Sequence, residues 1–398
     1  MASGNDMKSH WQLDPQLDFL NHGSFGAVPT VVLQVQQAFR DQLESDPIRF
    51  LAPERELEPK LDHVRGVLAD LVGADDRDVA FVLNATDGVN AVLRSFPFAD
   101  GDEIVVTNHG YNACINAAEF AAQRGGATVR VANVPFPIRD PGQVVDAIDH
   151  QLNDRTRLIM IDHITSPTGL VFPVAAVAEL AKSRGIRVLV DGAHGPGMVP
   201  LDLRSLGVDY YTANHHKWLC APKVSGFLWV HPQWQREVRP TIISHAANRP
   251  RPGRSQFLAE FDWKGTFDPT PILALPKAIE FLSSFYPGGL DQWMQVNRNL
   301  AIDALGLLSS GLGIEVTTPP EMIGSLVTVP LPKPENANAG EVHETLQSRL
   351  RQRYNIECPV FPGVQPGTYL LRIALQAYND LDQVHRLVAA LRDELGLS

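Results

Sequence analysis

Short apolar runs alternate with longer helical patterns over the first two thirds of the chain. Runs rich in β-branched and aromatic residues lie at 79–83, 103–108, 128–134, 157–164 and 186–191. Between them apolar residues recur at helical spacing, as in 111–125 and 173–185. Strands separated by helices of this length predict right-handed crossovers and an α/β fold, with a mostly parallel sheet and helices on both faces.

The pattern changes after about residue 270. Before that point, the runs at 209–214 and 226–230 follow each other so closely that we expect them to pair as neighbours. Beyond it, helical stretches at 271–285, 290–310 and 340–353 and a final helix accompany strand-like runs at 314–318, 325–331, 356–361 and 369–375. This mixture predicts a separate, smaller α+β domain at the C-terminal end.

Composition narrows the class of protein. A chain of 398 residues with 44% hydrophobic and 20% charged residues is typical of a globular protein with more than one core. The net charge is −11 and no long Lys/Arg block occurs, which argues against a nucleic-acid partner. No segment reaches membrane-spanning length, so no membrane partner is expected. The three cysteines are widely separated, which disfavours disulfides and structural zinc and predicts a cytoplasmic location.

Polar residues follow the ends of several predicted strands. Asp191 ends one apolar run, His194 comes three residues later, and Lys217 lies 26 residues after Asp191, behind two histidines. Because the carboxyl ends of parallel strands meet at one edge of a sheet, we expect these side chains to converge. Other residues at such ends are Thr86, Asp87, Asn108 to Tyr111, and Ser166.

Common alternatives lack support. The chain has no GxGxxG or GxxxxGK[ST] loop, no HExxH helix and no GxSxG elbow. The adjacent rings of His215 and His216 cannot easily reach one metal ion, so no metal site is expected.

A lysine that faces an acid suits a Schiff base with pyridoxal 5'-phosphate. Asp191 would keep the pyridine nitrogen of that cofactor protonated, and Lys217 would hold it and later carry a proton at the substrate α-carbon. Thr86 and free N–H groups at a helix start would accommodate the phosphate, and Tyr111 could stack on the ring. Each residue alone has an ordinary structural explanation, such as a surface charge or a helix cap. The combination favours the cofactor.

These residues also carry a resemblance. The segments "VDGAHGPG" (190–197), "HHKWLCAP" (215–222) and "GFLWV" (226–230) resemble the class V aminotransferases, which are fold type I pyridoxal phosphate enzymes. "FLNHGSFGAVP" (19–29), "WKGT" (263–266) and "LLRIALQAYND" (370–380) are most similar to the isopenicillin N epimerase-like branch, which is related to cysteine desulfurases and C–S lyases. The resemblance spans about residues 18 to 395. It implies an N-terminal arm (1–26) that joins the small domain and the active site, a large α/β domain (27–270) and a small α+β domain (271–398).

The resemblance assigns roles by position. Lys217 matches the Schiff-base lysine, Asp191 the pyridine-nitrogen partner and His194 a donor to the cofactor's phenolic oxygen. The phosphate contacts correspond to the backbone N–H of Ala85 and to the residues Thr86, His216 and Thr266. Because the family supplies the last of these from a second subunit, the resemblance implies a homodimer with shared active sites. Tyr111 falls where relatives stack a ring, and Ser166 replaces an Asn beside the phenolic oxygen. Substrate contacts correspond to Arg372, which would grip an α-carboxylate, and to His22 and Gly23.

The sequence departs from the pattern of the related enzymes at two positions that bear on the reaction. Desulfurases carry a nucleophilic cysteine on a loop before the arginine, whereas Cys358 lies inside an apolar run and is expected to be buried, which disfavours persulfide transfer. Lys223 is expected to be a neighbour of the cofactor lysine and not the attachment point.

The leading hypothesis is an enzyme that epimerises a small amino acid or its derivative by removing the α-proton. The alternatives are β-elimination by a C–S lyase (a cysteine desulfhydrase, or a lyase of cysteine conjugates or sulfoxides) and then transamination. A non-enzymatic scaffold is disfavoured by the joint presence of Lys217, Asp191 and Arg372.

Overall fold

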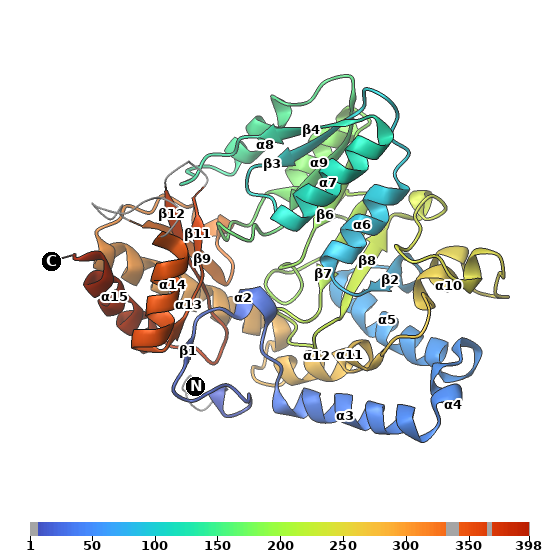
Figure 1. The fold of residues 1–398 in the computed structure, drawn as a ribbon, viewed down its shortest axis with the longest axis horizontal. Helices are drawn as coiled ribbons and strands as arrows, with labels where there is room; N and C mark the ends of the chain where they lie inside the picture. The colour runs from blue at the N-terminus through green and yellow to red at the C-terminus, as the bar shows by residue number, and fades with distance from the viewer. Residues whose placement is uncertain (1–6, 332–341, 364–367, 398) are drawn as a thin grey trace.

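A seven-stranded sheet forms the centre of the larger part of the molecule (Figure 1). The computed structural model describes residues 7–331, 342–363 and 368–397, with the side chains of 342–345 left out. The strands lie in the order β2 (Val79–Val82), β8 (Gly226–Val230), β7 (Tyr210–Asn214), β6 (Arg187–Asp191), β5 (Thr156–Asp162), β3 (Glu103–Thr107) and β4 (Thr128–Ala132). Only β8 runs antiparallel to its neighbours, so the predicted mostly parallel sheet and the pairing of 209–214 with 226–230 are confirmed.

Helices cover both faces of this sheet, as the apolar patterns predict. One face packs against α6 (Ala85–Ser95), α7 (Asn112–Gly125) and α10 (Gln256–Asp262). The other packs against α5 (Glu58–Val72), α8 (Gly142–Asp149), α9 (Val174–Ser183) and α12 (Leu275–Ser283). The helices α3 (Thr30–Ser45), α4 (Pro47–Leu51) and α11 (Thr270–Leu273) lie on the same side of the sheet as this second group. The central strands are buried on both faces, which explains their nearly continuous apolar sequences.

A second core surrounds a three-stranded antiparallel sheet near the C-terminal end. Its strands lie in the order β11 (Val360–Pro362), β12 (Tyr369–Ala374) and β9 (Leu326–Leu331). The apolar faces of α13 (Gly289–Leu312), α14 (Val342–Tyr354) and α15 (Leu381–Leu395) pack on it. The N-terminal β1 (Asp18–Phe19) pairs in parallel with β10 (Ile356–Glu357), so this segment lies beside the smaller sheet before it enters α2 (His22–Phe25).

Two local predictions need correction, and one helix was not predicted. Residues 314–318 form no strand: they are an irregular link that leads into Pro319 and Pro320, which cannot donate ladder hydrogen bonds. The run 356–361 is divided into β10 and β11, because Pro359 interrupts the ladder. The sequence interpretation also missed α3 altogether. Among the described residues, no helix is both long and apolar enough to cross a membrane.

A close helix–strand contact brings α6 to the edge where the site forms. Asn84 caps this helix by accepting the N–H of Asp87. At Gly88 a Cβ atom would lie 2.0 Å from Thr212 Oγ1, so only glycine permits the helix to pack this closely on β7. The N-terminus of α6 therefore lies beside the carboxyl ends of the central strands.

Candidate active site

A cavity of about 190 Å³ opens at the carboxyl ends of β5, β6 and β7. Its wall contains every residue predicted to contact the cofactor within one chain, namely Ala85, Thr86, Tyr111, Ser166, Asp191, His194, His216 and Lys217. These residues come from distant parts of the sequence. The crossovers of the parallel sheet bring them to one edge.

His194 and Lys217 face each other in this cavity. The indole Nε1–H of Trp218 donates to His194 Nδ1 at 3.1 Å. Because an indole nitrogen can only donate, the neutral imidazole must carry its proton on Nε2, which lies 3.1 Å from Lys217 Nζ. Burial, together with the positive charges of Lys217 and Arg372, holds the pKa of His194 well below its usual value. His194 therefore presents a neutral Nε2–H donor to the cavity.

Lys217 is adapted to act as an amine. Burial lowers the pKa of its ammonium group from 10.5 to about 8, although the negative charge of Asp191 opposes this shift. The uncharged amine that nucleophilic attack and proton abstraction require is then far more populated near neutral pH than in an ordinary lysine, although the ammonium form still predominates at pH 7.

Asp191 is held in a fixed orientation. Its Oδ1 accepts the N–H of Ala193 at 3.0 Å, and its Oδ2 accepts the Sγ–H of Cys114 at 3.0 Å. Asp162, in register on β5, also lines the cavity. Burial and the charge of Asp191 raise the pKa of Asp162 well above its usual range. The sequence interpretation missed Asp162, because the predicted run 157–164 extended past it, whereas β5 ends at this residue.

The start of α6 can accept an anion. The N–H of Ala85, the residue predicted to contact phosphate, donates to Asn214 Oδ1 at 2.8 Å. The Thr86 N–H has no hydrogen-bond partner among the described residues, and helix N-termini attract anions. His216 donates its Nδ1–H to the Ser225 carbonyl at 2.9 Å, which leaves Nε2 available to a ligand. Asn214 is a further site residue that the sequence interpretation missed.

Arg372 is a buried cation without an acidic partner in the described part of the chain. Its Nη1 donates to the carbonyl (2.6 Å) and hydroxyl (3.1 Å) of Ser166, and its Nη2 to Ser24 Oγ (3.0 Å) and Asn21 Oδ1 (3.3 Å). Its Nε has no hydrogen-bond partner there. Ser24 and Ser166 line the cavity, so the guanidinium lies directly behind its wall. Burying an uncompensated charge is costly, and an anionic ligand in the cavity would offset that cost.

Besides Arg372, three predicted residues do not line the cavity. Thr266 is exposed in another hollow, of about 400 Å³, together with Val224 and Ile242. His22 is fully buried behind Lys217. At Gly23 a Cβ atom would lie 2.8 Å from Leu326 Cδ2, so glycine allows the N-terminal segment to approach the smaller sheet.

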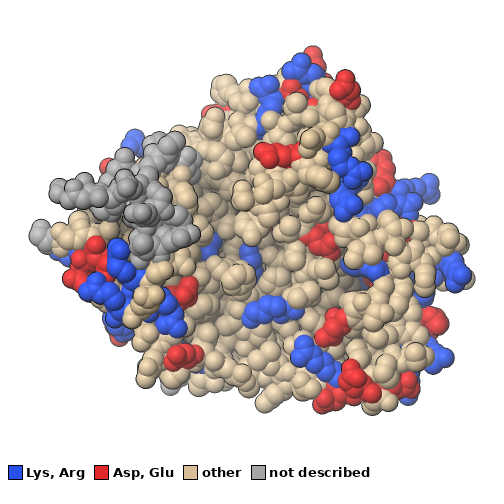
Figure 2. All heavy atoms as spheres, in the orientation of Figure 1, with Lys and Arg blue, Asp and Glu red and all other residues tan. Residues whose placement is uncertain are grey.

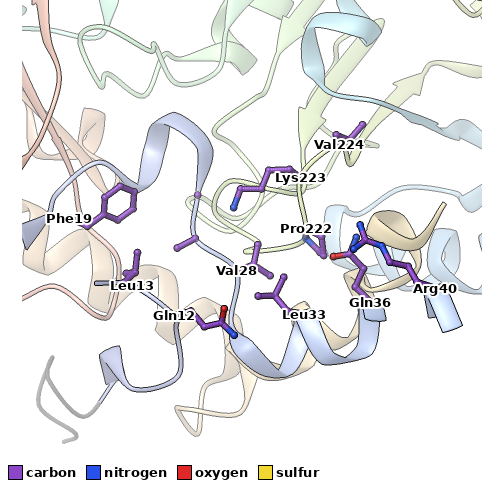
Figure 3. A pocket seen from close by; sticks show the side chains of 12 residues that line it. Gln12, Leu13, Phe19, Val28, Leu33, Gln36, Arg40, Pro222, Lys223 and Val224 are labelled. Carbon is purple, nitrogen blue, oxygen red and sulfur yellow. The ribbon is translucent and has the colours of Figure 1, made fainter. Parts of the chain in front are cut away.

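Lys223 occupies a different hollow from Lys217. This hollow measures about 550 Å³, and Figure 3 shows Lys223 extending over its middle, with Leu13 and Phe19 on one side and Gln36 and Arg40 on the other. Lys223 is not among the residues that line the cavity of Asp191.

The profile of the aminotransferase class-V family matches residues 21–387. The chain belongs to the aminotransferase class-V family. It is 34% identical to an isopenicillin N epimerase of Streptomyces clavuligerus, over 98% of both chains. It is 31% identical to a probable chloroplastic L-cysteine desulfhydrase of Arabidopsis thaliana, over 95% of this chain and 83% of that protein. Among solved structures, a C-DES variant with glycine covalently linked to its pyridoxal phosphate has a TM-score of 0.81 at 23% identity, covering 97% and 99% of the two chains.

This class-V enzyme is therefore pyridoxal phosphate-dependent and has the fold type I architecture. The residues of the cavity fit that cofactor: an amine whose pKa is lowered to about 8 (Lys217), a fixed carboxylate (Asp191) and an unpartnered helix N–H (Thr86) line one small space. Together they supply a lysine for covalent attachment, an acidic partner for the ring nitrogen and an anion-binding site for the phosphate.

Proposed function

We propose that this enzyme removes the α-proton of an amino acid or amino-acid derivative and returns it to give the epimer. Bound pyridoxal phosphate supplies an electron sink that weakens the bonds at the α-carbon. The observation that supports the proposal best is that Lys217 and His194 face each other in one cavity, while the Arg372 guanidinium lies directly behind the cavity wall, on Ser166.

Arg372 would bind the substrate through its α-carboxylate. The guanidinium is pre-positioned by Ser166 and Ser24, and a carboxylate would provide the anionic partner that it lacks among the described residues. If a carboxylate replaced the hydroxyls of Ser166 and Ser24 as the acceptors, the planar fork would donate two hydrogen bonds to it, which would fix the orientation of the substrate and hence of its α-hydrogen.

Lys217 and Asp191 would do the proton chemistry. With pyridoxal phosphate bound, the Lys217 amine would take the α-proton on one face of the α-carbon, because its pKa of about 8 allows both protonation states near neutral pH. Inversion would require a proton to be delivered to the opposite face, from water or from a second donor. Asp191 would hold a proton on the pyridine nitrogen. His194 would donate its Nε2–H to the phenolic oxygen.

A C–S lyase is the second candidate, supported by the 31% identity to the desulfhydrase of Arabidopsis thaliana. Persulfide transfer lacks a nucleophile: all three cysteines of the chain are buried, and burial raises the pKa of the Cys358 thiol above its usual value. Free, buried thiols also support a cytoplasmic location for this enzyme.

A homodimer with shared sites would bring Thr266 of one subunit to the phosphate of the other. Exposed apolar side chains support an interface here: Phe25 (74% exposed) and Tyr111 line the cavity mouth, and Val224 and Ile242 line the hollow of Thr266. In Figure 2 many charged side chains lie near the periphery of the view, and the central part is mostly uncharged surface with several Lys, Arg, Asp and Glu side chains in it. Such surfaces are typical of protein contacts.

The test is a panel of L-amino acids and cysteine conjugates incubated with the purified enzyme in heavy water. Epimerisation predicts α-deuterium in both enantiomers without release of pyruvate. Release of pyruvate from cysteine derivatives would instead establish the lyase. Lys217→Ala is the control and should be inactive in both assays. Turnover by that variant would refute the proposal.

A further inference from the structure

Three distant segments meet behind the lysine of the cavity. The ring of His22, from the N-terminal segment, lies between Tyr378, which follows β12, and the loop that carries Lys217. Its Nδ1 is 2.7 Å from the Tyr378 hydroxyl, and its Nε2 is 2.9 Å from the Lys217 carbonyl oxygen. His22 and Tyr378 are almost completely buried, so these contacts are shielded from water.

The chemistry of these atoms fixes the direction of both hydrogen bonds. A backbone carbonyl only accepts, so His22 must carry a proton on Nε2 and donate it to Lys217. Burial lowers the pKa of His22 to about 4, which leaves the ring neutral with that single proton. Nδ1 therefore accepts from Tyr378, whose hydroxyl keeps its proton because burial raises its pKa. The result is one ordered chain from the Tyr378 O–H through His22 to the Lys217 carbonyl.

The same ring touches the group that orients His194. The rings of His22 and Trp218 lie with their centroids 5.1 Å apart, and the Trp218 indole donates to His194 Nδ1. One histidine thus supports the backbone of Lys217 and the indole that determines which nitrogen of His194 carries the proton.

We propose that His22 and Tyr378 are positioning residues that set the place of Lys217 and His194 relative to the carboxylate site. The inference rests on the proposed role of Lys217 as the cofactor lysine. Tyr378 lies six residues after Arg372 in the sequence. The hydrogen bonds through His22 therefore connect the segment that would bind the substrate carboxylate to the loop that carries the reacting amine. His22 then acts through Lys217 and does not contact the substrate.

Two substitutions at His22 separate this role from general packing. In His22→Gln the amide N–H₂ can occupy the place of Nε2 and still donate to the Lys217 carbonyl. In His22→Asn the side chain is too short to do so. Tyr378→Phe removes only the hydroxyl that orders the ring. Tyr210→Phe is the matched control, because Tyr210 is equally buried but contacts Arg187 at the opposite end of β7.

The first readout is the rate at which cofactor-free enzyme captures pyridoxal phosphate covalently, followed by visible absorbance, and the second is kcat against KM. Loss of a buried hydrogen bond typically costs about 1.4 kcal/mol, so His22→Asn should slow capture and lower kcat about tenfold with little change in KM. Tyr378→Phe should have a smaller effect of the same kind, and His22→Gln should recover most of the loss. Tyr210→Phe should match the wild type.

Wild-type capture rates in both His22→Asn and Tyr378→Phe, or no recovery in His22→Gln relative to His22→Asn, would overturn the inference. If His22→Asn does not fold, Tyr378→Phe decides alone: a slower capture supports the inference and an unchanged rate overturns it. Lys217→Ala separates the two proposals, because capture that persists there refutes the proposed cofactor lysine itself. Capture that is lost in Lys217→Ala but unchanged in the His22 and Tyr378 variants refutes only the positioning role.

Discussion

Replacing Arg372 by lysine tests how the enzyme recognises its substrate. The guanidinium is buried, its Nη atoms donate to four oxygens of Ser166, Ser24 and Asn21, and it has no acidic partner among the described residues. Arg372→Lys keeps the positive charge but replaces a planar fork by a single ammonium group. It should therefore lose one of the two hydrogen bonds expected to a substrate carboxylate.

The expected magnitude follows from that loss. A hydrogen bond to a charged group contributes about 1.5–3 kcal/mol, so losing one of them should weaken substrate binding by about 2 kcal/mol, or about 30-fold. Binding of the amino acid and of the matching amine without a carboxylate can be compared through the spectral change of the bound cofactor. Only the amino acid should bind less tightly.

Arg298→Lys is a suitable control, because Arg298 also donates to neutral backbone oxygens, those of Pro320 and Ile323, but lies outside the cavity. It should leave both affinities unchanged. Equal weakening of the amino acid and the amine in Arg372→Lys, or no weakening of either, would refute the carboxylate role.

Three further predictions follow from the site. Capture of pyridoxal phosphate by the cofactor-free enzyme should rise with pH and reach half its maximum near pH 8, because only the free amine of Lys217 reacts and its pKa is about 8; a rate that keeps rising toward pH 10.5 would show an unperturbed lysine. Asp191→Asn should bind the cofactor weakly and lose most of its activity while its thermal unfolding stays close to that of the wild type, since the amide cannot hold the pyridinium proton; near-normal turnover would remove this role. Cys358→Ala should keep most of the activity, and mass spectrometry should find no persulfide after incubation with cysteine, since Cys358 is fully buried; a persulfide there would favour a desulfurase.

The sequence predicted the part of the site that depends on strand ends. Asp191 and Lys217 follow apolar runs, and in a parallel sheet the ends of such runs must meet, so their convergence could be inferred without coordinates. This reasoning missed Asp162, because the predicted run 157–164 continued beyond the end of β5, where Asp162 pairs in register with Asp191. The α/β class and the order of elements follow from the same periodicity.

Contacts between distant segments could not be inferred in this way. The placement of His22 behind Lys217 depends on a two-residue parallel pairing of β1 with β10, which leaves almost no pattern in the sequence. Asn214 takes the N–H of Ala85 only because Gly88 lets α6 lie close to β7. The strand expected at 314–318 has suitable β-branched residues, but no neighbouring strand is placed to pair with it in the described structure.

The central claim is that Lys217 is the covalent anchor of the cofactor, and one measurement tests it directly. The enzyme loaded with pyridoxal phosphate is reduced with borohydride, digested and examined by peptide mass spectrometry. We expect loss of the visible absorbance and a single phosphopyridoxyl adduct on Lys217. An adduct on Lys223, which lies in the neighbouring hollow, or no stoichiometric adduct on Lys217, would contradict the account.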